Sequence, residues 1–189
     1  MSLALIVDGD AEKIAFPRQF YTEPTIRRGL NGNRVTLDQI AKNTCNLVAS
    51  LAAKGCTKFI LIVDREDRAD DAEAVERSLQ TKISILTTLP VQVVVADKMF
   101  ENLLLADIEN IAVSYPETFV ICQNSLDHES THGKSVFKSF MKSGVVYRVS
   151  DVAQYFNKVR TASAIGNSRS YRRWIDAITA LGVPYIRRP

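Results

Sequence analysis

Short, continuously apolar runs alternate with longer segments of helical periodicity along this chain, and that alternation restricts the fold more than any other feature. The runs are LALIVDG (3–9), KFILIVD (58–64) and VQVVVADK (91–98), with TFVICQ (118–123) as a weaker fourth. Strands that are apolar throughout are buried on both faces, as in parallel sheets covered by helices. We therefore expect an α/β fold with a mostly parallel, Rossmann-like sheet of about four strands flanked by helices.

The segments between these runs have the periodicity and the boundary residues of helices. Asp10 is the expected N-cap of the first helix, which Pro17 interrupts. Residues 22–36 contain proline and glycine and are expected to form a loop, with at most a short strand at Arg34–Thr36. The other expected helices cover residues 36–54, 71–89, 99–115, 134–143, 150–163 and 168–181.

The balance of charge changes along the chain. Residues 134–189 contain eleven lysines and arginines against two acids, whereas the rest of the chain is acidic. We divide the chain into an α/β domain (1–123) and a basic, mostly helical extension packed on it (124–189). Such asymmetry is typical of a protein that binds a polyanion, although basic residues also solvate helix surfaces. Nucleic acid is the expected partner, and the residues expected to bind its phosphates are Lys158, Arg160, Arg169, Arg172 and Arg173.

Composition excludes several classes of protein. No run of eighteen apolar residues occurs, which argues against a membrane span, and the N-terminus lacks the basic region of a signal peptide. The three cysteines are odd in number and lie in apolar surroundings, as expected of buried free thiols in a reducing compartment. We expect a cytoplasmic protein.

Two of the expected strands end in an acid, Asp8 and Asp64. Because the carboxyl ends of parallel strands lie along one edge of the sheet, these carboxylates are expected to converge, and they must then share a proton or a cation. Glu66 points the same way as Asp64 if the chain stays extended, and Glu12 lies one helical turn beyond Asp8. Oxygen ligands favour Mg²⁺ or Mn²⁺ over zinc, so we predict such a site here. The alternative is that these acids cap helices and solvate a loop.

The stretch LIVDGDAEKIAF followed by FILIVDREDR resembles the Toprim domain of topoisomerases, primases and overcoming-lysogenization-defect nucleases. The later stretches KMFENLLLAD and SRSYRRWIDAI extend the resemblance over most of the chain. Taken together, they are most similar to small stand-alone Toprim-like proteins encoded beside ATPases in phage-defence loci. The resemblance thus implies a Toprim-like fold and an ATPase as a partner protein.

The resemblance also assigns roles to individual acids. Asp8 stands at the first acid of the family pattern, normally a glutamate, and Glu12 at the second; either would accept a proton. Asp64 and Glu66 stand at the paired acids. Glu101 stands at the helix glutamate and would be a further metal ligand. The implied activity is metal-dependent phosphodiester hydrolysis, with Asp8, Glu12, Asp64 and Glu66 as catalytic residues.

Two other functions stay open. Because Asp8 is shorter than the glutamate of the family pattern, the chain fits a non-catalytic module that binds nucleic acid or an ATPase. LIVDGD also resembles the opening strand of PIN-like ribonucleases, which would use further acids such as Asp97 and Asp107. DNA and RNA are equally compatible with the sequence, and so is a homo-oligomer.

Residues 128–132, HESTH, match the H-E-x-x-H pattern of zinc peptidases. That chemistry requires both histidines on one face of an amphipathic helix. The surrounding sequence has no apolar stripe, and Gly133 follows at once, so we expect a loop and a coincidental match. His128 and Glu129 are expected at the rim of the acidic site, where alanine substitutions would leave metal binding largely intact.

Overall fold

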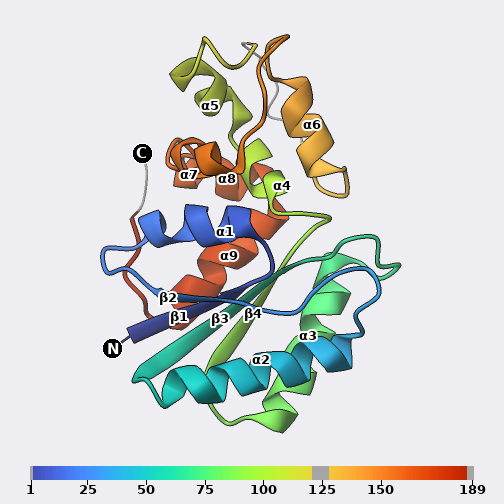
Figure 1. Cartoon of the computed structure of the whole chain (residues 1–189), viewed down its shortest axis with the longest axis vertical. Coiled ribbons are helices and arrows are strands. Elements are labelled where there is room, and N and C mark those ends of the chain that lie inside the picture. The colour runs from blue at the N-terminus through green and yellow to red at the C-terminus, as the bar shows by residue number, and fades with distance from the viewer. Residues whose placement is uncertain (1, 121–127, 187–189) are drawn as a thin grey trace.

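The computed structural model describes residues 2–120 and 128–186 of the chain (Figure 1). In these residues one sheet contains four strands in the order β2-β1-β3-β4, and all neighbouring strands run parallel. The predicted α/β class with a mostly parallel sheet is therefore confirmed. The strands are β1 (Ser2–Val7), β2 (Thr25–Arg28), β3 (Cys56–Asp64) and β4 (Val91–Ala96).

The sheet differs from the expected one at β2. This short edge strand lies within the segment that was expected to form a loop, and its sequence, TIRR, lacks an apolar run. The strand expected at Arg34–Thr36 is wrong, because Thr36 instead caps the next helix through a capping box with Gln39. The strand expected at 118–123 is wrong for residues 118–120, where Phe119 makes only an isolated antiparallel bridge to Met141; residues 121–123 lie outside the described part.

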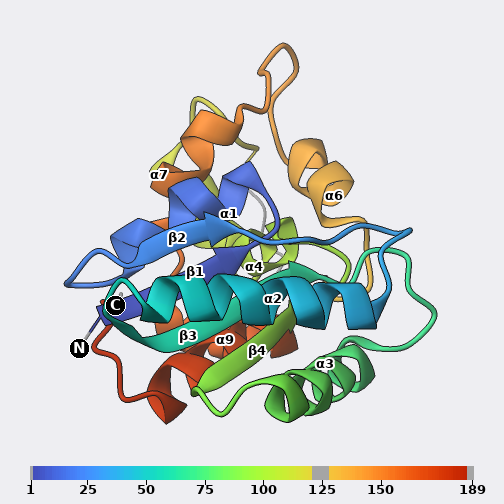
Figure 2. The same cartoon turned by 60° about the horizontal axis from the view of Figure 1, so that its bottom comes forward.

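Helices cover both faces of the sheet (Figures 1 and 2). Helices α2 (Leu37–Ala52) and α3 (Ala72–Leu86) pack on one face. The other face is covered by α1 (Asp10–Ala15), the 3₁₀ turn η1 (Phe16–Gln19) and α9 (Arg169–Ala180). Successive strand residues alternate between these two cores, as Leu5 and Ile6 do in β1.

Two segments expected to be single helices are each interrupted. The first forms α4 (Glu101–Leu105) and α5 (Ile108–Ser114), with Asp107 between them. The second forms the 3₁₀ turn η2 (Val149–Asp151), α7 (Val152–Phe156) and α8 (Thr161–Asn167). The carboxylate of Asp107 accepts hydrogen bonds from the backbone N–H and the guanidinium of Arg160. The interruption of the first segment is thus bonded to the interruption of the second. The remaining helix is α6 (Gly133–Ser139).

The C-terminal helices share a core with the sheet. Trp174 of α9 is fully buried and packs on Phe16, with ring centroids 4.5 Å apart, and on Phe20. Phe156 of α7 packs on Phe16 and Phe100. One apolar cluster therefore runs through both segments into which the sequence was divided. No helix in the described ranges is long and apolar enough to cross a membrane.

Side chains close the outer edge of β4. The backbone N–H of Val93 donates to Gln80 Oε1 at 3.1 Å, and that of Val95 donates to Glu76 Oε2 at 3.0 Å. The guanidinium of Arg173 donates to the carbonyl of Val95 at 2.9 Å. An open strand edge can pair with another chain, and these side chains of α3 and α9 block such pairing at β4. The other edge of the sheet is β2.

Candidate metal centre

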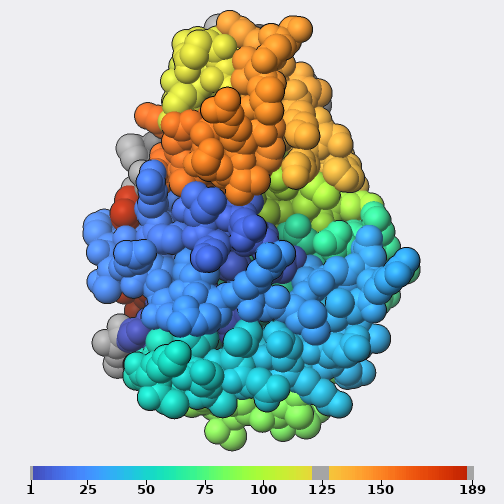
Figure 3. All heavy atoms as spheres, viewed as in Figure 1, coloured from blue at the N-terminus to red at the C-terminus, as the bar shows by residue number. Residues whose placement is uncertain are grey.

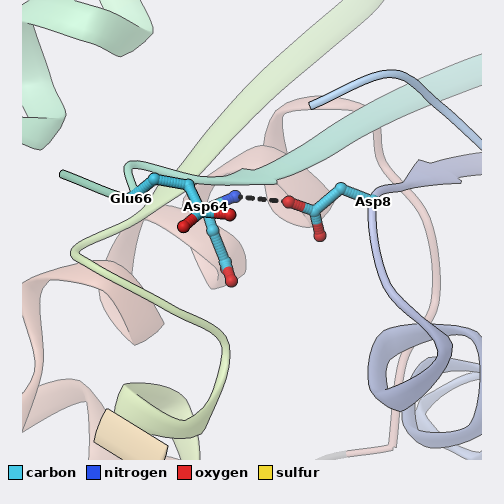
Figure 4. Close-up of side chains that lie close together, drawn as sticks. All are labelled: Asp8, Asp64 and Glu66. Carbon is cyan, nitrogen blue, oxygen red and sulfur yellow. Dashed lines mark hydrogen bonds between the residues drawn. The ribbon is translucent and has the colours of Figure 1, made fainter. Parts of the chain in front are cut away.

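The site lies where β1 and β3 end side by side. Asp8 directly follows β1, Asp64 ends β3, and Glu66 comes two residues later. One carboxylate oxygen from each of the three lies within 4.8 Å of the others (Figure 4). The structure thus brings together the three acids that the sequence places at neighbouring strand ends.

Two donors orient the Asp8 carboxylate. Its Oδ2 accepts hydrogen bonds from the backbone N–H of Asp64 at 3.1 Å and from Asn31 Nδ2 at 2.5 Å. Asn31 also donates to the backbone carbonyl of Asp64 at 2.9 Å and accepts from Arg68 at 2.8 Å. Asn31 follows β2, and the sequence reasoning missed it because that strand was not foreseen.

Glu66 reaches the site by a route that the sequence did not predict. Its backbone is not extended but lies in the left-handed region, with φ +58°, and Lys98 after β4 is also left-handed, with φ +71°. The N–H of Glu66 donates to the carbonyl of Lys98 at 3.0 Å, so each turn holds the other. Such conformations cost about 1–3 kcal/mol each for residues other than glycine and are concentrated at functional sites.

Two further acids stand behind these three. Glu12 of α1 and Glu101 of α4 are only 3% and 7% exposed. The Glu12 carboxyl interacts with that of Asp8, which raises the pKa of Glu12, and Glu101 Oε1 accepts a hydrogen bond from the Tyr147 hydroxyl at 2.9 Å. Neither belongs to the close group of three oxygens. The N-cap of α1 is Gly9 rather than Asp10, and a Cβ at Gly9 would overlap the Glu12 carboxylate.

Burial and mutual repulsion raise the pKa of several of these carboxyls. Burial is the main cause for Glu12, and the hydrogen bond and the charge of Asp8 raise its pKa further. For Asp64 burial again comes first, followed by the charges of the neighbouring acids. Burial and Asp8 raise the pKa of Glu66, while Arg68 partly offsets them. A group of acids in this state binds protons or a cation, and the all-oxygen donor set fits Mg²⁺ or Mn²⁺.

The acids line a pocket with a volume of about 420 Å³. Its wall also includes two cationic side chains, Arg28 at the end of β2 and Lys134 at the start of α6. Met99, Phe100 and Val149 supply apolar surface. The pocket therefore offers a site for a cation beside two positive groups that suit a phosphate.

The five basic residues proposed for phosphate binding lie elsewhere, and none lines the pocket in the described structure. Arg160 pairs with buried Asp107 at 2.8 Å, and Arg173 pairs with Glu73 at 2.6 Å and with Glu76 at 3.3 Å. The Arg172 guanidinium donates to the backbone carbonyl of Ile165, while the side chains of Lys158 and Arg169 are exposed.

The HESTH residues lie in a turn that leads into α6 rather than within a helix. His132 is the N-cap of α6 and accepts from the backbone N–H of Ser135. Glu129 was expected at the rim of the acidic site, but it is buried and fixes the start of α9. It accepts from Ser168 Oγ at 2.6 Å, from the Ser170 N–H at 2.9 Å and from Ser170 Oγ at 2.8 Å.

The acids needed for a PIN-like arrangement are engaged outside the pocket. Asp97 pairs with Arg65 at 2.6 Å and accepts from Ser130 Oγ at 2.7 Å. Asp107 pairs with Arg160, as described above. Neither aspartate lines the pocket, so neither adds a carboxylate to its acids.

Fold and site together define an α/β protein whose parallel sheet carries a cluster of acids at its carboxyl edge. Comparisons with family models, curated proteins and solved structures found no match to the chain.

Proposed function

We propose that the chain is a Toprim-like phosphodiesterase that cleaves nucleic acid with Mg²⁺ or Mn²⁺ held by Asp8, Asp64 and Glu66. The proposal rests on the approach of their three carboxylate oxygens to within 4.8 Å of one another. Oxygens that share one Mg²⁺ lie up to about 4.2 Å apart, since each bond is about 2.1 Å long. Small side-chain movements therefore suffice for all three to bind one ion.

An ion at this position would polarise the phosphate, lower the pKa of water and stabilise the leaving oxygen. The chain's own residues complete the chemistry. Arg28 and Lys134 are placed to bind the phosphate oxygens from the pocket wall. The hydrogen bonds from Asn31 and from the backbone of Asp64 fix the orientation of the Asp8 carboxylate, which would hold the ion.

Glu12 is the best candidate for the proton acceptor. A general base works best when its pKa lies near the working pH, and burial raises the pKa of Glu12 toward that range. Asp8 already accepts two hydrogen bonds, and one of its oxygens lies in the close group with those of Asp64 and Glu66. We therefore assign metal binding to Asp8 and proton transfer to Glu12, with Glu101 held beside them by Tyr147.

The experiment is a cleavage assay on plasmid, single-stranded DNA and RNA with Mg²⁺, Mn²⁺ or EDTA. Asp64→Asn is expected to abolish both metal binding and cleavage. Glu12→Gln is expected to lower the cleavage rate by about 10²–10⁴-fold while Mn²⁺ still binds. Asp176→Asn, on the exposed face of α9, is the matched control and leaves both unchanged.

Cleavage that persists in EDTA, or that survives Asp64→Asn, would contradict the proposal. Binding of nucleic acid without cleavage of any substrate would instead favour the non-catalytic module. The sequence resemblance also supports an ATPase partner and a role in phage defence. Co-purification of an ATPase with the tagged chain from its host tests the partner.

A further inference from the structure

Residues 134–149 leave the acidic pocket and return to it. Lys134 at the start of this segment and Val149 at its end both line the pocket. Between them the chain forms α6 and then a loop that projects beyond the neighbouring helices (Figure 2). In the space-filling view this segment, coloured orange, lies on the surface at one end of the molecule (Figure 3). We refer to residues 134–149 as the arm.

The arm carries only positive charge. It contains Lys134, Lys138, Lys142 and Arg148, and no acid occurs between Glu129 and Asp151. Lys134 and Lys138 are four residues apart in α6 and so lie on the same side of the helix.

The first two of these lysines are gathered next to the acidic site. Their ammonium groups lie 5.5 Å and 5.8 Å from the ring centroid of Tyr147, close enough for cation–π attraction. The hydroxyl of the same ring donates to Glu101 in the pocket. Tyr147 thereby links the cations of the arm to the acids of the site.

The base of the projecting loop is fixed. The backbone N–H of Val120 donates to the carbonyl of Phe140 at 2.8 Å, and that of Lys142 donates to the carbonyl of Thr118 at 2.9 Å. On the returning side, the hydrogen bond of Tyr147 holds the chain against α4. The loop is therefore anchored to the rest of the protein at both of its ends.

The tip of the loop is apolar. Val145 and Val146 are 38% and 69% exposed, and they follow a turn at Gly144, whose φ is +83°. Exposed Lys142 and Arg148 flank this pair. A cationic stem with an apolar tip matches a nucleic-acid strand, which presents phosphates along its backbone and base surfaces beside them.

We propose that the arm binds the nucleic-acid strand that enters the metal centre, with its lysines and Arg148 on the phosphates and Val145–Val146 on unstacked bases. This rests on the proposed function, because it takes the pocket as the place of cleavage. Charge complementarity selects the ligand: every charged residue of the arm is basic, and one of them, Lys134, lines the pocket together with the acids that would hold the ion. Its contacts with phosphates would carry no sequence information, so binding is expected to be insensitive to sequence.

Binding of a fluorescent single-stranded oligonucleotide, measured in Ca²⁺ over a range of salt concentrations, tests the proposal. Each phosphate contact that is lost lowers the slope of log K against log salt by about 0.7 for a single strand. Lys138→Ala/Lys142→Ala is therefore expected to lower that slope by about 1.4 and to weaken binding. Val146→Ser is expected to weaken binding with an unchanged slope, because it removes no charge.

The matched control is Lys42→Ala/Lys54→Ala, which removes two exposed lysines from α2 and the turn after it, away from α6 (Figure 1). It is expected to leave the affinity and the slope unchanged. Wild-type slope and affinity in the arm variant, or an equal loss in the control variant, would overturn the proposal. Loss of binding in the arm variant, from a wild-type protein that binds strands but never cleaves them, would support the arm and contradict the nuclease.

Discussion

The carboxylate of Asp8 accepts a hydrogen bond from the backbone N–H of Asp64 at 3.1 Å, so the side chain at one strand end is fixed by the backbone of its neighbour. Asn31 completes this arrangement by donating both to Asp8 and to the carbonyl of Asp64. Backbone atoms of β3 and a side chain after β2 thus hold Asp8 in place. Asp8 is therefore preorganised, because its partners come from β3 on one side of β1 and from the loop after β2 on the other.

Asn31→Ala is expected to weaken Mn²⁺ binding by about 10–100-fold, the usual cost of losing a residue that orients a metal ligand. Asp8, Asp64 and Glu66 themselves remain in this variant, so binding is weakened rather than abolished. Asn33→Ala is the matched control: it lies in the same loop but exchanges hydrogen bonds with Asp67, which is not one of these three acids. Calorimetric titration measures the Mn²⁺ affinity of both variants. Equal affinities would show that Asn31 does not contribute to metal binding.

Stability without metal is expected to fall as the pH rises. The pKa values of Glu12, Asp64 and Glu66 are raised in the folded chain above those of the unfolded chain, which lie near 4.5, 3.8 and 4.5. The folded state therefore binds more protons, and the stability that this contributes is lost as the pH rises through the raised values.

Divalent metal is expected to reverse this trend, because it replaces the protons that the acids hold. The gain in Tm on adding Mn²⁺ should thus be larger at about pH 8 than at about pH 5. Thermal unfolding with Mn²⁺ or EDTA across this range gives both curves. Asp64→Asn should flatten them, since the neutral amide carries no charge to bury. A metal-free Tm that rises over the same interval would contradict the assignment.

Gly9→Ala is expected to separate catalysis from metal binding. The added Cβ would overlap the carboxylate of Glu12, which must then move from its place beside Asp8. Cleavage should fall toward the level of Glu12→Gln, while Mn²⁺ affinity changes only a few-fold. Gly166→Ala in α8 is the control, because its Cβ would meet no atom within 4 Å. Cleavage at the wild-type rate in Gly9→Ala would show that the position of Glu12 is unimportant.

The central strands and their terminal acids could be predicted because each depends on a local pattern. β1 and β3 each contain a continuous apolar run, and the parallel arrangement that follows brings Asp8 and Asp64 to the same edge. The strand β2 could not be predicted in the same way. It is a short edge strand with two exposed arginines, and its pairing with β1 stabilises it rather than its own composition.

Other parts of the site depend on contacts between distant segments, which no local pattern reveals. Glu66 faces its neighbours because a left-handed turn is held by the carbonyl of Lys98, thirty-two residues later. Tyr147 reaches Glu101 from a segment that had no expected role. The basic residues were predicted from composition alone, and composition does not distinguish Arg173, which pairs with acids of α3, from a cation that faces the pocket.

Glu129→Ala is expected to destabilise the fold without affecting the metal centre. The Glu129 carboxylate accepts three hydrogen bonds from Ser168 and Ser170, both buried at the start of α9. Leaving a buried donor unpaired costs about 1–3 kcal/mol, and each kcal/mol lowers the Tm of a domain of this size by about 2–4 °C. We therefore expect a Tm lower by roughly 2–12 °C and unchanged Mn²⁺ affinity.

His132→Ala is the control in the same sequence motif, because this exposed residue caps only the short helix α6. It should lower the Tm much less than Glu129→Ala does. The comparison distinguishes the two possible roles of the HESTH sequence, zinc binding and structural support of α9. If the motif bound zinc, both substitutions would abolish the same zinc-dependent stabilisation, and EDTA would lower the Tm of the wild type but not of either variant. If Glu129 is a structural residue at the start of α9, the loss of stability follows Glu129 alone and persists in EDTA.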